Sequence, residues 1–388
     1  MIKRDAEKTL IQLSQQFKAV AIVGPRQSGK TTIARQVFGN KPYVSLENPD
    51  TRRFALEDPR AFLGQFPDGA VLDEAQRAPE LFSYLQQILD EDNVPGKFIL
   101  TGSNNFLLQE SISQSLAGRI AYLFLLPFGI SELSGFNLNL QDLIFKGTYP
   151  PIYDQPVDPG KWYSDYIRTY IERDVRQLKN INDLNVFERF LRLCAGRIGQ
   201  LLNMSNLAIE AGVDSKTIAS WIGVLESSFI LYRLQPHYSN FNKRIVKMSK
   251  LYFYDTGLAC SLLGINTSQQ LDYHFMTGSL FENLIITEII KNRYNNALNK
   301  NLFFWRDNVG HELDILIEYP HGLFPVEIKY GKTITPEFFK GLLFWQKISN
   351  TNNGAVVYGG DHPQTRSNGI EIIPWNKSSE LALGGGKS

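Results

Sequence analysis

Cysteine is scarce in this chain of 388 residues, which contains only Cys194 and Cys260. Two cysteines are too few for a disulfide framework or a thiolate zinc site, and their scarcity fits a reducing compartment. We therefore expect both to be core residues. Net charge is also small, because 40 lysines and arginines oppose 39 aspartates and glutamates and leave +1. A general affinity for polyanions is not expected, so any contact with nucleic acid has to come from a local basic patch.

Long hydrophobic runs are absent as well. The most apolar stretch, residues 120–130, is far shorter than the roughly 20 residues that cross a bilayer, and it contains a proline. The first 17 residues scatter charges along an amphipathic pattern and lack the apolar core of a signal peptide. These absences predict a cytoplasmic protein with no membrane partner.

The length predicts more than one core, since domains average about 150 residues. Glycine and proline interrupt the pattern at residues 147–151, and a helix-rich composition follows. We expect one α/β domain over residues 1–155, a helical region over 156–245 and a second α/β domain over 246–380. The glycine-rich residues 381–388 are expected to form a flexible tail.

A phosphate-binding motif lies near the N-terminus. The apolar run Ala19 to Val23 precedes the pattern G-x-x-x-x-G-K-T, and a helical pattern follows. Backbone N–H groups of such a loop converge on bound phosphates, Lys30 reaches the β- and γ-phosphates, and Thr31 coordinates Mg²⁺. The residues expected to bind ATP are Gly24, Pro25, Arg26, Gln27, Ser28, Gly29, Lys30, Thr31 and Thr32.

Two carboxylates follow a second apolar run, at Asp73 and Glu74. Asp73 is expected to hold Mg²⁺ directly or through water. Glu74 is placed to polarise an attacking water, which favours hydrolysis over storage of the nucleotide. A third apolar run begins at Lys97, and polar residues at the carboxyl end of a buried parallel strand lie beside the ligand crevice. These polar residues are Thr101, Ser103 and Asn104.

The segments GPRQSGKTT, VLDEAQ, LTGSN and SLAGR together resemble AAA-superfamily ATPases of bacteria and archaea, in which a conserved domain of unknown function follows the ATPase domain. The segments YIERDV, YFYDTGLA, SLFENLIITEI and ELD…VEIK are similar to that C-terminal domain, so the resemblance extends from about Lys18 to Lys329. It implies a sensor residue at Ser103 or Asn104. It also makes Arg119 a candidate for an arginine that touches the γ-phosphate, in cis or from a neighbouring subunit of a homo-oligomer; the alternative is a solvated arginine.

Residues 203–227 predict two short helices across a glycine turn, as in winged helix-turn-helix modules. The second helix offers only Lys216 as a cation between Asp214 and Trp221, which is little for phosphate contacts. A neighbouring segment could form a basic wing with Lys243, Arg244, Lys247 and Lys250. DNA is therefore one candidate partner, and an interface between domains or subunits is the alternative.

A β-hairpin is predicted around the turn residues Pro320 and His321. With this turn Tyr319 pairs with Gly322, and Asp314 falls opposite Glu327. Residues 304–318 are expected to form the single strand that leads to Asp314. An upstream helical segment carries Glu282, and the order helix Glu, strand Asp, then Glu-x-Lys resembles restriction-endonuclease-like folds.

Such a set could hold a second divalent cation through Glu282, Asp314 and Glu327, with Lys329 as a catalytic partner. Without a cation or another partner the carboxylates would repel one another. The predicted fold is thus α/β: a P-loop NTPase with an AAA-type parallel sheet, then a winged-helix-like region and a restriction-endonuclease-like domain.

Three functions remain open at this point. The first is a Mg²⁺-dependent ATPase whose hydrolysis drives rearrangement of the C-terminal module, with DNA as a candidate partner. The second is a nucleotide-dependent signalling or partner-binding switch without cleavage activity. The third is an ATP-regulated, metal-dependent DNA nuclease.

Overall fold

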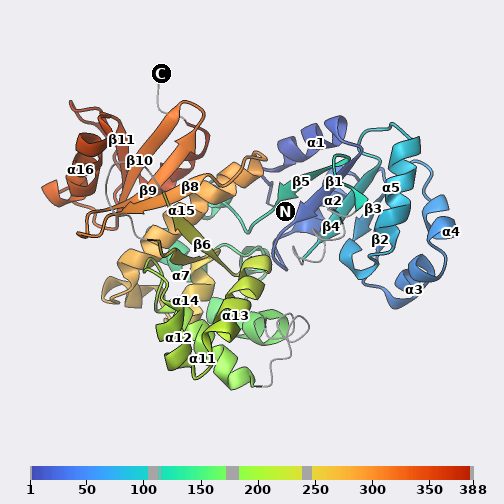
Figure 1. Cartoon of the computed structure of the whole chain (residues 1–388), viewed down its shortest axis with the longest axis horizontal. Coiled ribbons are helices and arrows are strands. Elements are labelled where there is room, and N and C mark those ends of the chain that lie inside the picture. The colour runs from blue at the N-terminus through green and yellow to red at the C-terminus, as the bar shows by residue number, and fades with distance from the viewer. Residues whose placement is uncertain (1, 104–111, 113–114, 172–182, 238–246, 385–388) are drawn as a thin grey trace. The chain divides into compact units, whose positions relative to one another are not determined.

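The continuous apolar runs of the N-terminal third form a parallel sheet in the computed structural model of the chain (Figure 1). The order is β2-β3-β4-β1-β5, and every neighbouring pair is parallel. Both faces of such a sheet are covered, which is why its central strands read as unbroken apolar runs. The strands are β1 (Ala19–Val23), β2 (Tyr43–Ser45), β3 (Ala70–Asp73), β4 (Phe98–Gly102) and β5 (Ile120–Phe124). The strand expected at residues 19–23 is confirmed.

The structure describes residues 2–103, 112, 115–171, 183–237 and 247–384. The chain divides into two compact units. The first comprises Met1–Phe128, Ser227–Phe229 and Tyr294–Leu298, and the second comprises Gly129–Glu226, Ile230–Arg293 and Asn299–Ser388.

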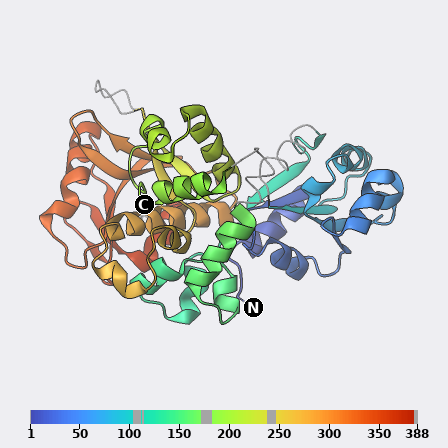
Figure 2. The same cartoon turned by 90° about the horizontal axis from the view of Figure 1, so that it is seen from below.

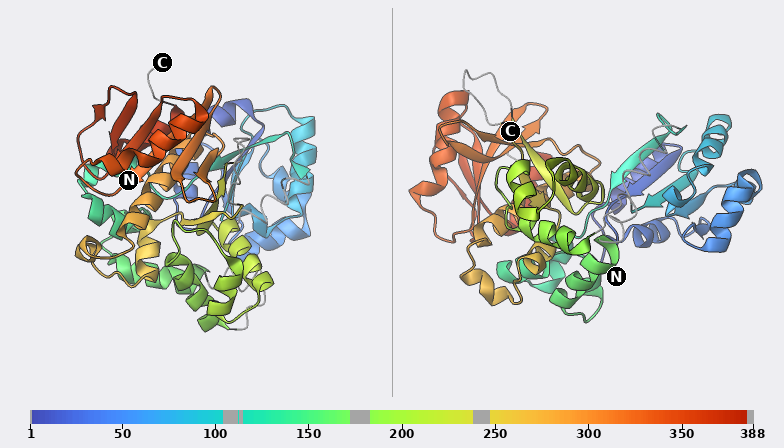
Figure 3. Two further views of the ribbon diagram at one scale, coloured as in Figure 1. Left: turned by 60° about the vertical axis from the view of Figure 1, so that its left-hand side comes forward. Right: turned by 60° about the horizontal axis from the view of Figure 1, so that its bottom comes forward.

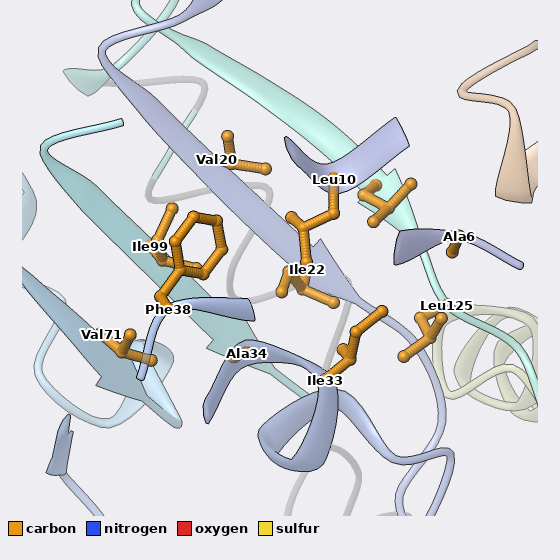
Figure 4. Close-up of a cluster of buried hydrophobic side chains, with 11 residues drawn as sticks. Ala6, Leu10, Val20, Ile22, Ile33, Ala34, Phe38, Val71, Ile99 and Leu125 are labelled. Atoms are coloured by element: carbon orange, nitrogen blue, oxygen red, sulfur yellow. The ribbon is translucent and has the colours of Figure 1, made fainter. Parts of the chain in front are cut away.

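Helices cover the parallel sheet of the first unit. They are α1 (Glu7–Gln16), α2 (Lys30–Val37), α3 (Pro49–Glu57), α4 (Pro59–Gly64), the short 3₁₀ turn η1 (Ala75–Arg77) and α5 (Leu81–Glu91). The side chains of α1 and α2 pack against β1, β3 and β4 in one buried cluster, as Figure 4 shows for Leu10, Ile22 and Ile33. This packing fixes the start of α2 at the carboxyl edge of the sheet.

The second unit contains a mixed sheet of eight strands in the order β12-β13-β11-β10-β9-β8-β6-β7. The strands are β6 (Leu231–Pro236), β7 (Lys250–Phe253), β8 (Leu302–Arg306), β9 (Glu312–Tyr319), β10 (Gly322–Lys329), β11 (Gly354–Tyr358), β12 (Gln364–Thr365) and β13 (Ile370–Pro374). Tyr319 pairs with Gly322 and Ile315 with Val326, so the predicted hairpin register is confirmed.

The prediction of one strand over residues 304–318 is wrong. A turn divides this segment into β8 and β9, which pair antiparallel. The Asp307 carboxylate Oδ1 accepts hydrogen bonds from the backbone N–H groups of Val309 (3.0 Å), Gly310 (2.9 Å) and His311 (2.9 Å). These bonds stabilise the turn locally, as aspartate side chains commonly do.

The helices of the second unit are α7 (Leu140–Lys146), α8 (Pro151–Asp154), α9 (Pro159–Tyr166), α11 (Leu184–Ala195), α12 (Met204–Ala211), α13 (Ser215–Ser227), α14 (Thr256–Leu262), α15 (Thr277–Asn295) and α16 (Lys340–Ser349). Shorter helical turns are η2 (Ser131–Phe136), the π-turn η3 (Ile167–Ile171), η4 (Ser268–Asp272), η5 (Pro336–Phe339) and η6 (Trp375–Leu383). The two helices expected within residues 203–227 are α12 and α13, and Gly212 joins them with a φ of 77°.

Two groups of elements build the core of the second unit. The helices α11 to α13, in green tones in Figure 2, gather where Phe187 and Phe190 contact the ring of Trp221. The C-terminal strands, orange to red in Figure 3, carry α16 on one face, where Leu342 and Trp345 are buried with Trp305. Cys194 and Cys260 are buried as expected, and burial raises the pKa of both thiols. Of the helices that the structure describes, none has the length and apolar character of a membrane span.

Candidate functional site

The predicted phosphate loop connects the end of β1 to the start of α2. A Cβ on Gly24 would lie 2.1 Å from the carbonyl oxygen of Leu125, so only glycine fits there. Gly29 has a φ of 91°, which other L-residues rarely adopt. Both motif glycines are therefore required by the backbone itself, and α2 begins directly at Lys30.

Lys30 and Ser28 are the buried polar residues of this loop. The Lys30 ammonium donates to the carbonyl oxygens of Gly24 (3.0 Å) and Pro25 (2.7 Å). The Ser28 hydroxyl is buried and has no hydrogen-bond partner. Buried polar groups are almost always paired, and a helix N-terminus attracts anions. The Ser28 hydroxyl thus provides an unused donor where a phosphate oxygen would bind.

Asp73 lies at the end of β3 and receives hydrogen bonds from three hydroxyl groups. Thr31 donates to its Oδ1 at 2.8 Å, Tyr43 donates to its Oδ2 at 2.8 Å, and Thr101 also donates to Oδ1. Burial and then the bond to Asp73 raise the pKa of Tyr43 to about 12. Thr31 and Asp73, each predicted to hold Mg²⁺, thus lie in contact with each other. Sequence reasoning missed Tyr43, because no motif marks it.

Glu74 follows with a strained backbone, at φ 55° and ψ 44°. Non-glycine residues rarely adopt this conformation, and it often marks functional positions. The Glu74 Oε2 accepts from the Ser103 hydroxyl at 3.0 Å and from the Gln76 amide at 2.5 Å. The structure thus brings Ser103 to Glu74, whereas Asn104 lies outside the described residues.

Arg119 lies at the opposite edge of the parallel sheet from the phosphate loop. It precedes β5, whereas the loop follows β1, and Ala19 pairs with Ile120 at the amino edge. Five strand residues separate the edges, or about 16 Å at ~3.3 Å per residue. The Arg119 guanidinium binds the Asp90 carboxylate at 2.5 and 2.9 Å. From this position Arg119 does not reach a phosphate bound by its own chain. A contact with the phosphate of a neighbouring subunit stays a prediction.

The predicted C-terminal residues fall into two groups. In the first, Asp314 Oδ2 accepts from the Lys329 ammonium at 3.0 Å and from the Ile328 N–H at 2.7 Å, and Lys329 also binds Glu327. Although burial opposes it, the charges of Lys329 and Lys250 lower the pKa of Asp314 to about 2. Burial and the neighbouring Asp314 carboxylate raise the pKa of Glu327 well above its usual range.

Glu282 belongs to the second group, on α15. Its Oε1 accepts from the Tyr252 hydroxyl at 2.5 Å and from the Lys250 ammonium at 3.3 Å, and Lys250 also binds Glu312. Burial raises the pKa of Glu282 despite the charge of Lys250. Lys250 is only 2% exposed, so its expected place in a basic wing is wrong. Lys243 and Arg244 of that wing lie outside the described residues.

Within the described parts of the chain, no three histidine, cysteine, aspartate or glutamate side chains are grouped as a metal ion would require. The sequence missed Lys250, Tyr252 and Glu312 as neighbours of Glu282. The signal that could have found them is the alternation of strand residues, since Lys250 and Tyr252 share one face of β7 and Glu312 and Asp314 share one face of β9.

Three families match successive parts of this sequence. Residues 16–134 match an AAA domain, residues 137–269 match a domain of unknown function (DUF8612), and residues 277–378 match another (DUF4143). Two uncharacterized proteins, of Mycobacterium bovis and Mycobacterium tuberculosis, are each 30% identical over 383 residues, which covers 96% of this chain and 83% of each relative.

Solved structures of a Walker-type ATPase and of DnaA are also similar. The Walker-type ATPase of Pyrococcus abyssi aligns with a TM-score of 0.44 and 15% identity, over 68% of this chain and 96% of that one. AMPPCP-bound DnaA of Aquifex aeolicus aligns with a TM-score of 0.30 and 15% identity, over 57% of this chain and 85% of that one.

Proposed function

This chain belongs to one family with the two mycobacterial proteins and joins an AAA domain to a C-terminal domain of unknown function, and we propose that it hydrolyses MgATP to rearrange its C-terminal unit. The observation that carries the proposal is the contact between Thr31 and Asp73, with Glu74 next to it. These three residues come from the motif positions that P-loop ATPases use for magnesium and for water.

The loop residues are suited to bind the nucleotide. Backbone N–H groups of residues 24–32 and the buried Ser28 hydroxyl would donate to the phosphates, and the Lys30 ammonium would exchange its carbonyl partners for phosphate oxygens. Thr31 and Asp73 offer the oxygen ligands that Mg²⁺ prefers. When bound there, Mg²⁺ would neutralise charge that develops on the phosphates.

Glu74 is the proposed catalytic carboxylate. Its backbone conformation turns it out of β3, and Ser103 and Gln76 hold one of its carboxylate oxygens. A carboxylate held in this way can orient a water molecule and accept its proton. The bond from Ser103 supports that residue as the sensor in place of Asn104.

Arg4 connects the phosphate loop to residues 126–128, the end of the first stretch of the first unit. Its guanidinium is buried, donates to the carbonyl oxygens of Ser28 and Leu126 at 2.7 Å each, and lies 4.9 Å from the ring of Phe128. Phe128 is the last residue of this stretch of the first unit. A movement of the phosphate loop would therefore act through Arg4 on the segment that leads into the second unit.

Phosphate release from ATP tests the proposal directly. The wild-type chain is expected to release phosphate only with Mg²⁺, and Lys30→Ala is expected to abolish the release. Lys8→Ala is the matched control, since Lys8 is an exposed lysine on α1 of the same unit. Release by Lys30→Ala at the wild-type rate would refute the assigned site.

Arg119 is proposed to act in trans, in a homo-oligomer. A mixture of Lys30→Ala, which keeps Arg119, and Arg119→Ala, which keeps the loop, should then hydrolyse ATP faster than either variant alone. Additive behaviour of the two samples would exclude a shared site between subunits.

The C-terminal unit is proposed to bind a partner, and DNA is the candidate. The observation in favour is the helix-turn-helix order of α12 and α13, with Lys216 in the first turn of α13. Retention on duplex DNA should fall steeply with salt and weaken in Lys216→Ala and in a Lys243→Ala/Arg244→Ala variant. Equal retention of wild type and both variants would show that these three residues do not contribute to DNA binding.

A further inference from the structure

The carboxylates that the hairpin and α15 bring together are matched by lysines from within the chain. Glu282, Glu312, Asp314 and Glu327 all lie in ion pairs with either Lys250 or Lys329. Carboxylates this close need positive charge to remain together, and either a divalent cation or an internal cation can supply it. The contacts of Lys250 and Lys329 bear on the choice between a divalent cation and an internal cation.

Lys250 neutralises the half of the cluster that contains Glu282. Its ammonium lies 3.3 Å from Glu282 Oε1 and is also hydrogen-bonded to Glu312. The Tyr252 hydroxyl donates to the same Glu282 Oε1, and the second oxygen, Oε2, lies 3.3 Å from the position of a Cβ on Gly199. A side chain at position 199 would therefore press against Glu282, and glycine leaves this oxygen its space. The Lys250 side chain is 2% exposed, so its charge cannot be shared with bulk water.

Lys329 neutralises the other half of the cluster. Asp314 Oδ2 accepts from both the Lys329 ammonium and the Ile328 N–H. Glu327 Oε2 is bound by the same ammonium. Glu327 Oε1 faces α16, where a Cβ on Gly341 would lie 1.7 Å away. Glycine at the start of α16 therefore lets the helix cover the Glu327 side that a cation would need.

We propose that Lys250 takes the place of the cation expected from the resemblance to nucleases, and that this cluster is a closed ion-pair centre without a divalent metal. A divalent cation needs about six oxygen ligands, and here one oxygen of each of the four carboxylates is already paired with a lysine ammonium. Bringing a +2 ion among them would also place it beside two ammonium groups in a poorly solvated site. Among the described residues, no three histidine, cysteine, aspartate or glutamate side chains are grouped as a metal ion held by such side chains alone would require.

The consequence is that this cluster does not support metal-dependent cleavage, independently of whether the first unit hydrolyses ATP. The centre instead joins β7, β9, β10 and α15 through buried charges. Breaking one such pair leaves an uncompensated charge, so the lysines are needed for this part of the fold.

Binding of Mn²⁺ without nucleotide tests the proposal, measured on the full chain by electron paramagnetic resonance. In wild type and in Lys250→Arg, which keeps the charge, the substitution Asp314→Asn is expected to leave Mn²⁺ binding unchanged. Lys250→Met removes the charge at similar length and should bind Mn²⁺ at least tenfold more tightly than wild type. The double variant Lys250→Met/Asp314→Asn should lose this gain.

Mn²⁺ that binds the wild-type chain and is released by Asp314→Asn would overturn the proposal, and so would a folded Lys250→Met protein that gains no affinity. If Lys250→Met does not fold, the comparison of wild type with Asp314→Asn decides alone. Equal Mn²⁺ binding by those two proteins then supports the ion-pair centre. Because these samples contain no ATP, their outcome is separate from that of the ATPase assay.

Discussion

Asp255 is a buried carboxylate of the second unit on which four hydrogen bonds converge. It is 2% exposed and accepts from the Thr148 N–H (2.7 Å), the Thr148 hydroxyl (2.9 Å), the Tyr163 hydroxyl (2.6 Å) and the Leu258 N–H (2.9 Å). The carboxylate thereby caps α14 and ties it to the segment before α8. Without it, the Thr148 N–H, the Thr148 hydroxyl and the Leu258 N–H would lose these bonds, whereas the Tyr163 hydroxyl would keep the Lys146 carbonyl oxygen at 3.0 Å.

Asp255→Ala should therefore lower the free energy of unfolding by about 3 kcal/mol or more, since each unpaired buried donor costs ~1–3 kcal/mol. Urea denaturation followed by circular dichroism measures this. Asp361→Ala, at an exposed aspartate, should change it by less than ~0.5 kcal/mol. Equal effects of the two substitutions would show that the hydrogen bonds of Asp255 do not stabilise the fold.

The close approach of Gly24 to the Leu125 backbone gives a second prediction for a single residue. Gly24→Ala places a methyl group 2.1 Å from the Leu125 carbonyl oxygen, so the loop has to move and ATP binding should weaken at least tenfold. Gly64→Ala is the matched control, since a Cβ there meets nothing within 4 Å and its φ is not positive. Titration of both variants with a fluorescent ATP analogue distinguishes them, and unchanged affinity in Gly24→Ala would contradict the geometry.

Residue patterns identified neighbouring residues of the first candidate site, but they missed several neighbours in the second. The loop motif and the Asp73-Glu74 pair have a fixed order in the sequence, which assigned both Thr31 and Asp73 to Mg²⁺, and the two side chains lie 2.8 Å apart. The burial of Lys250 could not be predicted in the same way, because a lysine in a basic stretch is expected to be exposed to solvent. Its burial depends on Glu282 and Glu312, which lie far away in the sequence.

At the scale of elements, α15 binds the start of the second unit through Glu288. The Glu288 Oε2 accepts from the Ile130 N–H at 3.0 Å, and its Oε1 accepts from the Asn292 side chain at 2.8 Å. Lys291 and Glu132 are the charged groups that act on it. Burial outweighs the charge of Lys291 and raises the pKa of Glu288 from 4.5 to about 7.

This shift predicts a dependence of stability on pH. Between pH 4.5 and 7 the folded chain binds the Glu288 proton more tightly than the unfolded chain, so stability falls as the pH rises through that range. The loss amounts to about 3 kcal/mol at ~1.4 kcal/mol per pKa unit. The glutamine of Glu288→Gln cannot ionise. The free energy of unfolding of this variant, measured with urea, should therefore rise by this amount relative to that of wild type as the pH increases from 4 to 8. A difference that stays constant over this range would contradict the prediction.

Elements with strong periodicity were predictable, and their ends were less so. The helices α12 and α13 and the β9–β10 register follow from glycine and turn residues in the sequence. The break between β8 and β9 was missed although Asp307, Asn308 and Gly310 are turn-forming residues, because the apolar residues before and after them were assigned to one strand. It is the carboxylate of Asp307, bonded to three backbone N–H groups, that reverses the chain there.

On the scale of the whole molecule, the chain joins an ATPase domain to a second unit with two further domain matches. The sequence predicted the α/β class and the P-loop sheet, because they depend on local patterns. It could not decide what the C-terminal cluster does, because charge balance there depends on long-range contacts. The proposed division of labour is ATP hydrolysis in the first unit and partner binding in the second.

Glu74→Gln tests the central claim most directly, in a single-turnover measurement of phosphate release with ATP binding measured on the same sample. The variant should bind ATP as tightly as wild type and release phosphate about 100-fold or more slowly, because it keeps the shape of the side chain and loses the base. Glu80→Gln, at an exposed glutamate nearby, should behave as wild type. Release by Glu74→Gln at the wild-type rate would contradict the account.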